Sequence, residues 1–529
     1  MFDRNGSVKA AVAVAITTAL VAGCSVLTGD SGEVDHSVEV GTTSAPTVLD
    51  PAAAWDNSWE LYKNVFQTLT TMSQDSSSPQ FEAAKQCGFT DSESSVYRCT
   101  LRKGLKFSNG HPLTAKAVKY SFDRIFAIDS KSGPSGLLES LDKVETPNKR
   151  TVVFHLKKPD ATFPFKLATP AGSIVDPASY PAKKLRKGDS VVGSGPYTLK
   201  AYVKGKKAEL AKNPKYKGLA RVKNSKVTID YFKRSTDMTE ALKRKKIDVA
   251  LRQLSPGQVS SLQSADAKGK RDITVHELPG TDTRFLVFNP KDPVAGKPAV
   301  RKAVAQLVDR KALARKAYNW TVDPLYSMVP TGITSHTNTF LDKYGQPDRD
   351  KAAQELASAG IHKKVRLTLW YTTDRYGSAT KVEFQELKRQ LEGSGLFSVT
   401  IKGRPWSEFV KGYSKGKYPV FGRGWFPDFP DPDNYVGSFV GKKNAIATPY
   451  ETSRITNKLL PRERKEIDRA KAGRYLASAQ RIFADDAQLL PLWQGKLYVA
   501  AQRNVSGVEW VFDPRALPQM WELHKKSSW

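Results

Sequence analysis

With 529 residues, of which 40% are hydrophobic and 26% are charged, the chain has the composition of a folded globular protein, not that of a disordered or collagen-like one. The length exceeds what one hydrophobic core supports, so we expect two or three domains. The formal net charge of +30 is compatible with a nucleic-acid partner. The 7 His are isolated from one another and the 3 Cys show no zinc spacing, so we predict no sequence-local metal site.

The N-terminal segment has the build of a secretory signal over residues 1–23. Arg4 and Lys9 supply positive charge, and residues 10–22 form an uncharged stretch. This stretch is shorter than the roughly 20 residues that a membrane-spanning helix needs. The ending Val-Ala-Gly-Cys24 resembles the lipobox of bacterial lipoproteins. The resemblance implies that Cys24 is lipidated and anchors the mature protein to the outer face of the cell membrane. The alternative is ordinary secretion, which leaves Cys24 as a free thiol.

Export changes the interpretation of the basic charge. Without residues 1–23 the chain loses Asp3, Arg4 and Lys9, and its net charge stays near +29. Export argues against a nucleic-acid partner. Anionic lipid headgroups and acidic wall polymers attract Lys and Arg over a Debye length of about 8–10 Å. We favour the simpler interpretation that the Lys, which are spread along the chain, keep its surface soluble.

Two cysteines remain after Cys24. Cys87 and Cys99 lie close in the sequence. In an oxidising compartment such a pair is expected to be oxidised, so we predict a disulfide between them. Closing a loop of about a dozen residues stabilises a fold by roughly 3 kcal/mol if the effect is the lost entropy of the unfolded chain.

Strand and helix patterns alternate along the rest of the chain. Residues 25–36 are mostly small and polar and are expected to form a flexible tether, with the folded part beginning near Ser37. Alternating apolar residues predict strands, and apolar residues at helical spacing predict amphipathic helices. Strands are expected around 38–40, 152–156, 365–369 and 399–401, and helices around 114–125, 300–308, 384–391 and 475–483.

Single residues predict two boundaries, and the order of elements predicts the fold class. Thr114 is the expected N-cap of the helix behind it. The chain is expected to break at Pro491, just after Leu489 and Leu490. The strand–helix–strand order over 365–401 is the unit of a parallel sheet, because parallel strands need a crossover connection. The predicted class is therefore α/β.

Four segments carry recognisable motifs. Together, in order and spacing, they resemble the extracytoplasmic solute-binding proteins of peptide-type ABC importers, the oligopeptide- and dipeptide-binding family (bacterial solute-binding family 5). The resemblance covers nearly the whole mature chain. It departs from the family at Lys116-Ala117, where an acidic residue is usual, on an expected surface helix. The segments are 101–110 (LRKGLKFSNG) with 112–124, 193–197 (GSGPY) with 213–216 (NPKY), 288–290 (FNP) with 300–310, and 424–432 (GWFPDFPDP).

The resemblance implies a two-lobed periplasmic-binding-protein-like fold of type II with an additional inserted subdomain. Lobe I is expected to be discontinuous, and the lobes are expected to close on a ligand by bending near 278–279 and 493–494. The expected boundaries are 37–72, 190–278 and 494–529 for lobe I, 73–189 for the inserted subdomain, and 279–493 for lobe II.

The function that the resemblance implies is capture of oligopeptides or dipeptides in the inter-lobe cleft and their delivery to an ABC permease in the membrane. ATP is hydrolysed elsewhere in such a system, so we expect no cofactor. We also expect a monomer. Recognition of peptide main chain, which all sequences share, together with wet side-chain pockets would give broad specificity.

The fourth motif supplies the candidate ligand residues. In peptide-binding members of the family, the aspartate three positions after the tryptophan pairs with the α-ammonium of the peptide, and that position here is Asp428. A buried ammonium needs a carboxylate because an unpaired buried charge is costly. Trp425 would offer a flat apolar wall. Trp55 lies in a segment that resembles the family's first cleft loop. Asp431 and Asp433 are expected to shape the turn through Asx hydrogen bonds.

Other functions stay open at this point. The same fold binds other solutes, such as a metal chelate, haem, an oligosaccharide or a signalling peptide. An anchored regulatory lipoprotein without transport is a second class. An exported hydrolase is the third, because residues 412–416 fit G-x-S-x-G, but their basic flanks predict a surface loop around Ser414 and no nucleophile elbow. We therefore predict no catalytic residues.

Overall fold

The computed structural model describes residues 37–269, 272–441, 444–447, 450 and 452–526. The predicted lipidation site Cys24, the signal segment and the tether lie outside the described residues. Within those ranges, no helix combines the length and apolarity that a membrane span requires.

A mixed sheet of eleven strands runs through the described residues, in the order β15-β14-β16-β12-β17-β11-β1-β10-β9-β8, with β13 beside β17. Strands β14 and β15 are parallel, which confirms the predicted strand–helix–strand unit. The strands are β1 (Ser37–Thr42), β8 (Tyr197–Val203), β9 (Lys207–Lys212), β10 (Lys226–Tyr231), β11 (Val249–Leu251), β12 (Ile273–Phe288), β13 (Val322–Pro324), β14 (Val365–Thr372), β15 (Phe397–Arg404), β16 (Val420–Trp425) and β17 (Leu489–Gln502).

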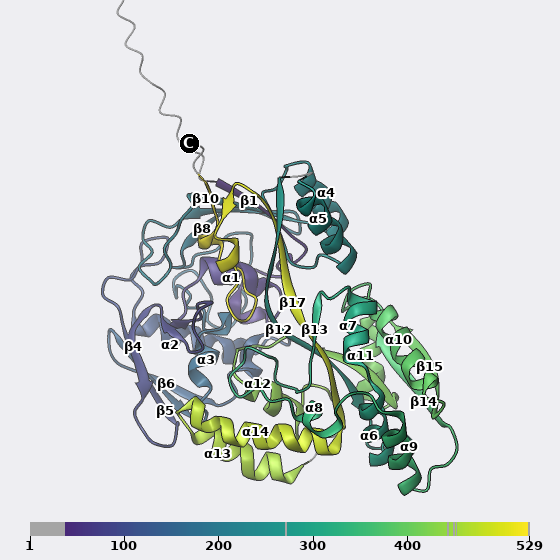
Figure 1. Ribbon diagram of the computed structural model, residues 1–529. Coiled ribbons are helices and arrows are strands. Elements are labelled where there is room, and N and C mark those ends of the chain that lie inside the picture. The colour runs from purple at the N-terminus through teal and green to yellow at the C-terminus, as the bar shows by residue number, and fades with distance from the viewer. Residues whose placement is uncertain (1–36, 270–271, 442–443, 448–449, 451, 527–529) are drawn as a thin grey trace, which may run out of the picture. The chain divides into compact units, whose positions relative to one another are not determined.

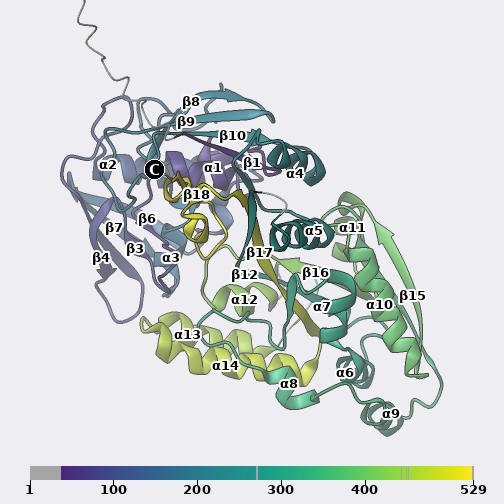
Figure 2. The same cartoon turned by 45° about the horizontal axis from the view of Figure 1, so that its top comes forward.

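Two long antiparallel strands, β12 and β17, join the two large hydrophobic cores (Figures 1 and 2). Leu278 of β12 packs in the first core and Phe285 in the second. Between them the register shifts from Pro279 to Thr283. A Cβ on Gly280 would lie 2.2 Å from the carbonyl oxygen of Gly495, so the two backbones approach each other where only glycine fits.

The first core gathers β1, β8–β10, a helix near the N-terminus and a separate four-stranded sheet, β4-β5-β7-β6. Its elements are α1 (Ser58–Val65), β2 (Thr70–Thr71), β3 (Gln80–Phe81), β4 (Ala84–Phe89), β5 (Val96–Leu101), α2 (Ala115–Ile128), β6 (Leu141–Asn148), β7 (Thr151–Leu156) and α3 (Phe163–Leu167), with β18 (Val505–Ser506) and β19 (His524–Lys525) near the C-terminus. A smaller cluster packs α4 (Ser235–Lys243) and α5 (Pro256–Ala267) near β11.

The second core lies around β14, β16 and the adjoining half of β12. Helix α10 lies beside β15 (Figure 2). The helices are α6 (Pro298–Leu307), α7 (Arg310–Tyr318), α8 (Thr339–Tyr344), α9 (Arg349–Ser358), α10 (Thr380–Gly393), α11 (Trp406–Ser414), α12 (Asp433–Val436), α13 (Leu460–Lys465) and α14 (Arg469–Asp486).

Most local predictions are confirmed. The expected strands are β1, β7, β14 and β15, and the expected helices are α2, α6, α10 and α14. Helix α2 begins behind Thr114, although the Thr114 side chain makes no capping hydrogen bond.

The predicted break at Pro491 is wrong, because β17 continues through it. The strand accommodates the proline at a register shift opposite Arg284 and Phe285. The Pro491 carbonyl accepts a 2.8 Å hydrogen bond from Arg310 Nε, which helps to hold the strand at this position.

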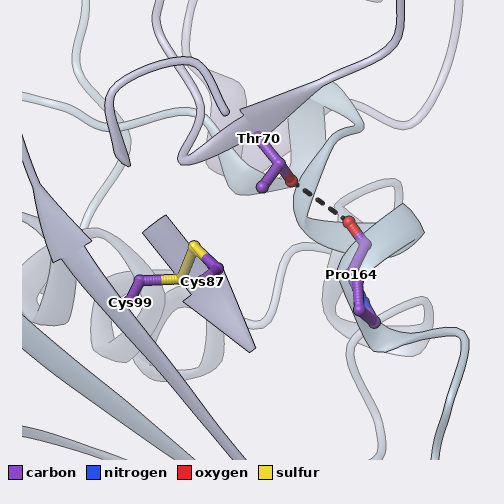
Figure 3. The surroundings of a disulfide bond; sticks show 4 residues. All are labelled: Thr70, Cys87, Cys99 and Pro164. Carbon is purple, nitrogen blue, oxygen red and sulfur yellow. Dashed lines mark hydrogen bonds between the residues drawn. A yellow bond between two sulfur atoms is a disulfide. The ribbon is translucent and has the colours of Figure 1, made fainter. Parts of the chain in front are cut away.

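Cys87 on β4 lies directly opposite Cys99 on β5, and a disulfide joins them. Figure 3 shows this bond and, in the same view, the 3.2 Å hydrogen bond that Thr70 Oγ1 donates to the Pro164 carbonyl. That hydrogen bond links β2 to α3. The disulfide thus crosslinks two neighbouring strands of the four-stranded sheet.

Candidate functional site

The GWFPDFPDP segment leaves the end of β16 as a proline-rich loop. Trp425, the last residue of β16, pairs with Thr283 on β12. The loop ends where α12 begins at Asp433. Tyr435 on α12 donates a 2.8 Å hydrogen bond to the Thr281 carbonyl, so the loop is held against β12 where the register of that strand shifts. Proline limits the backbone freedom of such a loop and helps to hold its side chains in place.

Asp428 lies at the centre of a hydrogen-bond network in this loop. Its Oδ1 accepts a 2.8 Å bond from Trp55 Nε1, and its Oδ2 accepts a 3.2 Å bond from Asn434 Nδ2. The Asn434 Oδ1 accepts bonds of 3.0 Å from both Trp425 Nε1 and the Asp428 backbone N–H. The structure therefore brings together Trp55, Trp425 and Asp428, the three residues singled out from the sequence, and adds Asn434, which links two of them.

Sequence reasoning missed Asn434. It lies six positions after Asp428, in a stretch where short polar residues are common in turns, so its type alone gave no signal. Its role follows from the loop geometry, which turns the amide back onto the residues before it.

Asp428 differs from the other two acidic residues of the loop in having no ion-pair partner among the described residues. Asp431 accepts 2.8 Å hydrogen bonds from Arg469 Nε and Nη2, and Asp433 lies 3.3 Å from Arg464 Nη2. Among the described residues, no ion pair joins Asp428 to a basic side chain. Burial raises the pKa of Asp428 to about 6, and the hydrogen bonds from Asn434 and Trp55, together with the more distant charge of Lys166, only partly oppose this.

The expected Asx hydrogen bond is present at Asp431, whose Oδ1 accepts the Asp433 backbone N–H at 2.9 Å. The ion pairs of Asp431 and Asp433 were not predicted. They join the loop to α13 and α14, and they anchor its far end with charges that are largely buried.

Trp55 reaches Asp428 from the first-core side of the molecule. Its loop is held by Asp50, which is buried and accepts hydrogen bonds from Arg124 Nη1 and the Arg186 backbone N–H, both at 2.7 Å. The Trp55 side chain itself is 39% exposed. The Trp55 indole N–H therefore links its own loop, on the first-core side, to the GWFPDFPDP loop. Part of the Trp55 ring is exposed to solvent.

A cavity of about 490 Å³ lies between side chains of the first core, the second core and the β12–β17 pair. Phe426 lines it, two positions before Asp428, and so does the buried Arg284 of β12. Trp55, Trp425 and Asp428 do not line it. Its volume lies in the range of roughly 300–1,000 Å³ typical of small-molecule sites. Extended residues advance about 3.3–3.6 Å each, which places the Asp428 backbone within about 7 Å of that of Phe426.

A second cavity, of about 390 Å³, lies within the first-core region and is lined by Tyr62, Lys63 and Trp521. It contains none of the residues predicted to bind ligand. Lys63 in its wall is buried, which lowers its pKa to about 8 even though Asp513 lies 3.4 Å away.

The G-x-S-x-G segment does not form a nucleophile elbow. The predicted loop is wrong for Gly412 and Ser414, which belong to α11. The helix continues there because Gly412 is buried against the ring of Tyr418 and Tyr413 packs in the second core. Ser414 is exposed at the helix end, and no hydrogen bond joins it to a base in the part of the chain that the structure describes. The described residues also hold no cluster of His, Cys, Asp and Glu suited to a metal ion.

Residues 78–446 match the family described as bacterial extracellular solute-binding proteins, family 5 Middle. The chain is 26% identical over 507 residues to the probable D,D-dipeptide-binding periplasmic protein DdpA of Escherichia coli K12, covering 92% of this chain and 93% of DdpA. It is also 26% identical over 511 residues to the glutathione-binding protein GsiB of Escherichia coli O157:H7, covering 94% and 95% of the two chains.

Solved structures share the fold. The substrate-binding protein CtaP of Listeria monocytogenes superposes with a TM-score of 0.79 at 19% identity, covering 93% of this chain and 100% of CtaP. DppA of Helicobacter pylori in complex with the peptide STSA has a TM-score of 0.75 at 20% identity, covering 93% and 98%. The chain belongs to the bacterial extracellular solute-binding proteins of family 5, the solute-binding proteins of peptide-type ABC importers. The predicted two-lobed α/β fold is confirmed.

Proposed function

We propose that this protein is the extracytoplasmic solute-binding component of an ABC importer, and that it captures short peptides between its lobes and delivers them to a membrane permease. The observation that carries the proposal is the state of Asp428. Its carboxylate is half-buried, and its hydrogen-bond donors among the described residues are neutral, whereas Asp431 and Asp433 beside it each have an arginine. A free peptide amino terminus would supply the ion-pair contact that Lys166, which acts on Asp428 only from a distance, does not make.

The electrostatics favour an ammonium ligand over a neutral one. Burial disfavours the charged form of Asp428, and a cation at hydrogen-bond distance would offset that cost and lower the pKa again. Trp425 and Trp55 would supply the apolar walls, with their N–H groups already directed into the Asp428–Asn434 network. An incoming ammonium would have to share or displace the Trp55 hydrogen bond.

The relatives support a peptide over other solutes. DdpA and GsiB are named for a D,D-dipeptide and for glutathione, and the Helicobacter pylori structure holds a tetrapeptide. AgaA of Agrobacterium, with a TM-score of 0.73, holds agropinic acid, so the fold also takes non-peptide solutes. A metal chelate, haem or an oligosaccharide is therefore the alternative ligand, and a regulatory lipoprotein without transport is the alternative role.

Several further parts of the proposal follow from the sequence. The lipid anchor on Cys24, the monomeric state and the absence of a catalytic role belong to it. The lobe boundaries expected from the sequence are also part of the proposal. The separation of the two cores supports them, because Leu278 and Phe285 lie on the same strand and pack in different cores. The bend would lie between those two residues, where the register of β12 shifts.

The test is a thermal-shift screen of the purified protein with di- to hexapeptides, each with a free and an acetylated amino terminus. A ligand that binds only the folded state raises the melting temperature by mass action. We expect stabilisation by free-amine peptides that is lost on acetylation and in Asp428→Asn. Asp142→Asn, which removes an exposed carboxylate on β6, is the matched control and should respond as wild type. The absence of any shift across the panel would exclude peptide capture in this length range.

A further inference from the structure

The cavity between the two cores is lined by an excess of basic side chains. Five basic residues and one acidic residue line it: Lys233, Arg252, Arg284, Arg375, Lys496 and Asp282. The first-core cavity of the same protein serves as an internal comparison, because its charged residues balance. Those are Lys63, Arg221, Lys223, Asp75, Glu82 and Glu522. The positive lining of the larger cavity is therefore more than a reflection of the basic composition of the chain.

Two of the five basic residues are neutralised by acidic residues outside the lining. Arg252 Nη1 lies 2.6 Å from Glu60, and Lys496 Nζ lies 2.8 Å from Glu277. Lys233 and Arg375 are exposed at the cavity, and no ion pair joins either of them to an acidic residue in the described ranges. Charges of one sign in a concave site raise the local concentration of the opposite charge.

Arg284 is the basic residue best placed to receive an anion. Its side chain is buried, with only 7% of the residue exposed. Its guanidinium carbon lies over three aromatic rings, 4.2 Å from the ring centre of Tyr376, 4.9 Å from that of Trp493 and 5.1 Å from that of Phe426. Stacked rings hold the guanidinium plane and leave its edge available for hydrogen bonds. Gly424 on the neighbouring strand makes room for it, since a Cβ there would lie 2.4 Å from Nη1.

The described residues use only part of the hydrogen-bond capacity of Arg284. Nη1 donates to the Thr283 carbonyl at 3.0 Å and lies 3.3 Å from Asp282 Oδ2, a long ion-pair contact. Nε is buried and has no hydrogen-bond partner in the part of the chain that the structure describes. A buried donor without a partner is costly, so native proteins rarely keep one unless a ligand or water completes it.

A further carboxylate, Glu383, is close enough to interact electrostatically with Arg284. It does not supply the hydrogen bond that Arg284 Nε lacks among the described residues. Burial raises the pKa of Glu383 to about 7, although Tyr318 donates a hydrogen bond to it and Arg284 lowers the value. Glu383 is therefore only partly ionised near neutral pH. No hydrogen bond joins it to Arg284 among the described residues.

We propose that this cavity selects acidic peptides, with Arg284 receiving a side-chain carboxylate of the ligand while Arg375 and Lys233 attract it at the mouth. This inference rests on the proposed peptide-binding function and adds the class of peptide. A cavity of about 150 Å³ holds a benzene-sized group, so 490 Å³ has room for roughly three such groups, which fits a peptide of two or three residues.

The experiment is calorimetric titration of the full chain with the isosteric tripeptides Ala-Glu-Ala and Ala-Gln-Ala, which differ only in one negative charge. We expect wild type to bind the glutamate peptide at least about tenfold more tightly, as a charge-assisted hydrogen bond in a buried site would give. Arg284→Met should abolish this preference and Arg375→Gln should reduce it.

The matched control is Arg366→Gln, which removes an exposed positive charge on β14 outside the cavity lining. It should keep the full preference, and this separates a local site from attraction by the net charge. If Arg284→Met fails to fold, the preference for Ala-Glu-Ala is measured in the exposed variants Arg375→Gln and Lys233→Gln instead. A reduced preference in them supports the inference, and an unchanged preference overturns it.

Equal binding of the two peptides by wild type would overturn the inference and leave the proposed function standing. A preference that Arg284→Met, Arg375→Gln and the control all preserve would overturn it as well. If neither peptide binds, nor any other peptide of the thermal-shift panel, the proposed function fails and the inference fails with it.

Discussion

Peptide binding should weaken as the pH falls from 7 to 5, because Asp428 takes up a proton in that range. Burial raises its pKa to about 6 in the unliganded protein. The peptide ammonium pairs with the ionised carboxylate, so below pH 6 each binding event must expel a proton. The α-amino group of a peptide has a pKa of about 7.7–8.0 and stays charged throughout this range, so its own titration does not interfere.

The magnitude follows from the ionised fraction of Asp428. With a pKa of about 6 the carboxylate is about 90% ionised at pH 7 and about 10% ionised at pH 5. The apparent Kd is the intrinsic Kd divided by the competent fraction, so it should rise about tenfold over these two pH units. Calorimetric titrations at pH 5, 6 and 7, in two buffers with different ionisation enthalpies, measure both Kd and the number of protons released. Near pH 6 that number should be about one half per peptide.

Asp428→Asn is the control, since it cannot titrate and should bind weakly with little dependence on pH. Glu383, which also has a raised pKa, remains in this variant, so any pH dependence due to it would persist there. A wild-type Kd that does not change between pH 7 and 5, or a pH dependence equal in Asp428→Asn, would refute the pairing of Asp428 with the ligand. Without ligand the sign is the opposite. The raised pKa favours folding below the ordinary value of 3.8, and this contribution is lost as the pH rises through about 6.

Three further predictions concern the surroundings of the site. Trp55→Phe removes one of the hydrogen bonds that lower the pKa of Asp428, so the midpoint of the pH dependence of binding should lie at a higher pH than in wild type. An unchanged midpoint in the same titrations would contradict the Trp55–Asp428 contact. Asp431→Asn leaves the largely buried Arg469 with one carboxylate partner fewer and should lower the free energy of unfolding by about 3 kcal/mol in urea titrations, whereas a change below about 1 kcal/mol would mean that Glu463 compensates. Replacing both Cys87 and Cys99 by Ser should cost roughly 3 kcal/mol of stability under oxidising conditions, and a wild-type protein equally stable with and without reductant would argue against the bond.

The local elements were predictable because side-chain periodicity is a local property of the chain. The alternation at Val365, Leu367 and Leu369 and the helical spacing behind it led to β14 and α10. The prediction failed at Pro491 because the strand tolerates a proline only through a register shift against β12, about 200 residues earlier in the chain. At Gly412 it failed because the packing of Tyr413 and Tyr418 outweighed the basic flanks.

The candidate site divides in the same way. Asp428 and Trp425 were found from a motif whose residues are adjacent in sequence. Asn434 and Arg284 were not, because each is an ordinary residue in its own segment. Arg284 acquires its position from Tyr376, Phe426 and Trp493, which come from three separate segments and meet only in the fold.

The sequence by itself determined the alternation of strands and helices, the family that the ordered motifs indicate, and the carboxylate proposed to meet an ammonium. Each of these depends on residue type and short-range spacing. Only the tertiary structure decided that the Trp55 indole N–H meets Asp428 across 373 residues, that no described basic side chain forms an ion pair with this carboxylate, and that a positively lined cavity includes Phe426, two positions before it. Burial and pairing depend on residues that are distant along the chain, and it is burial and pairing that set the charge state of a binding site.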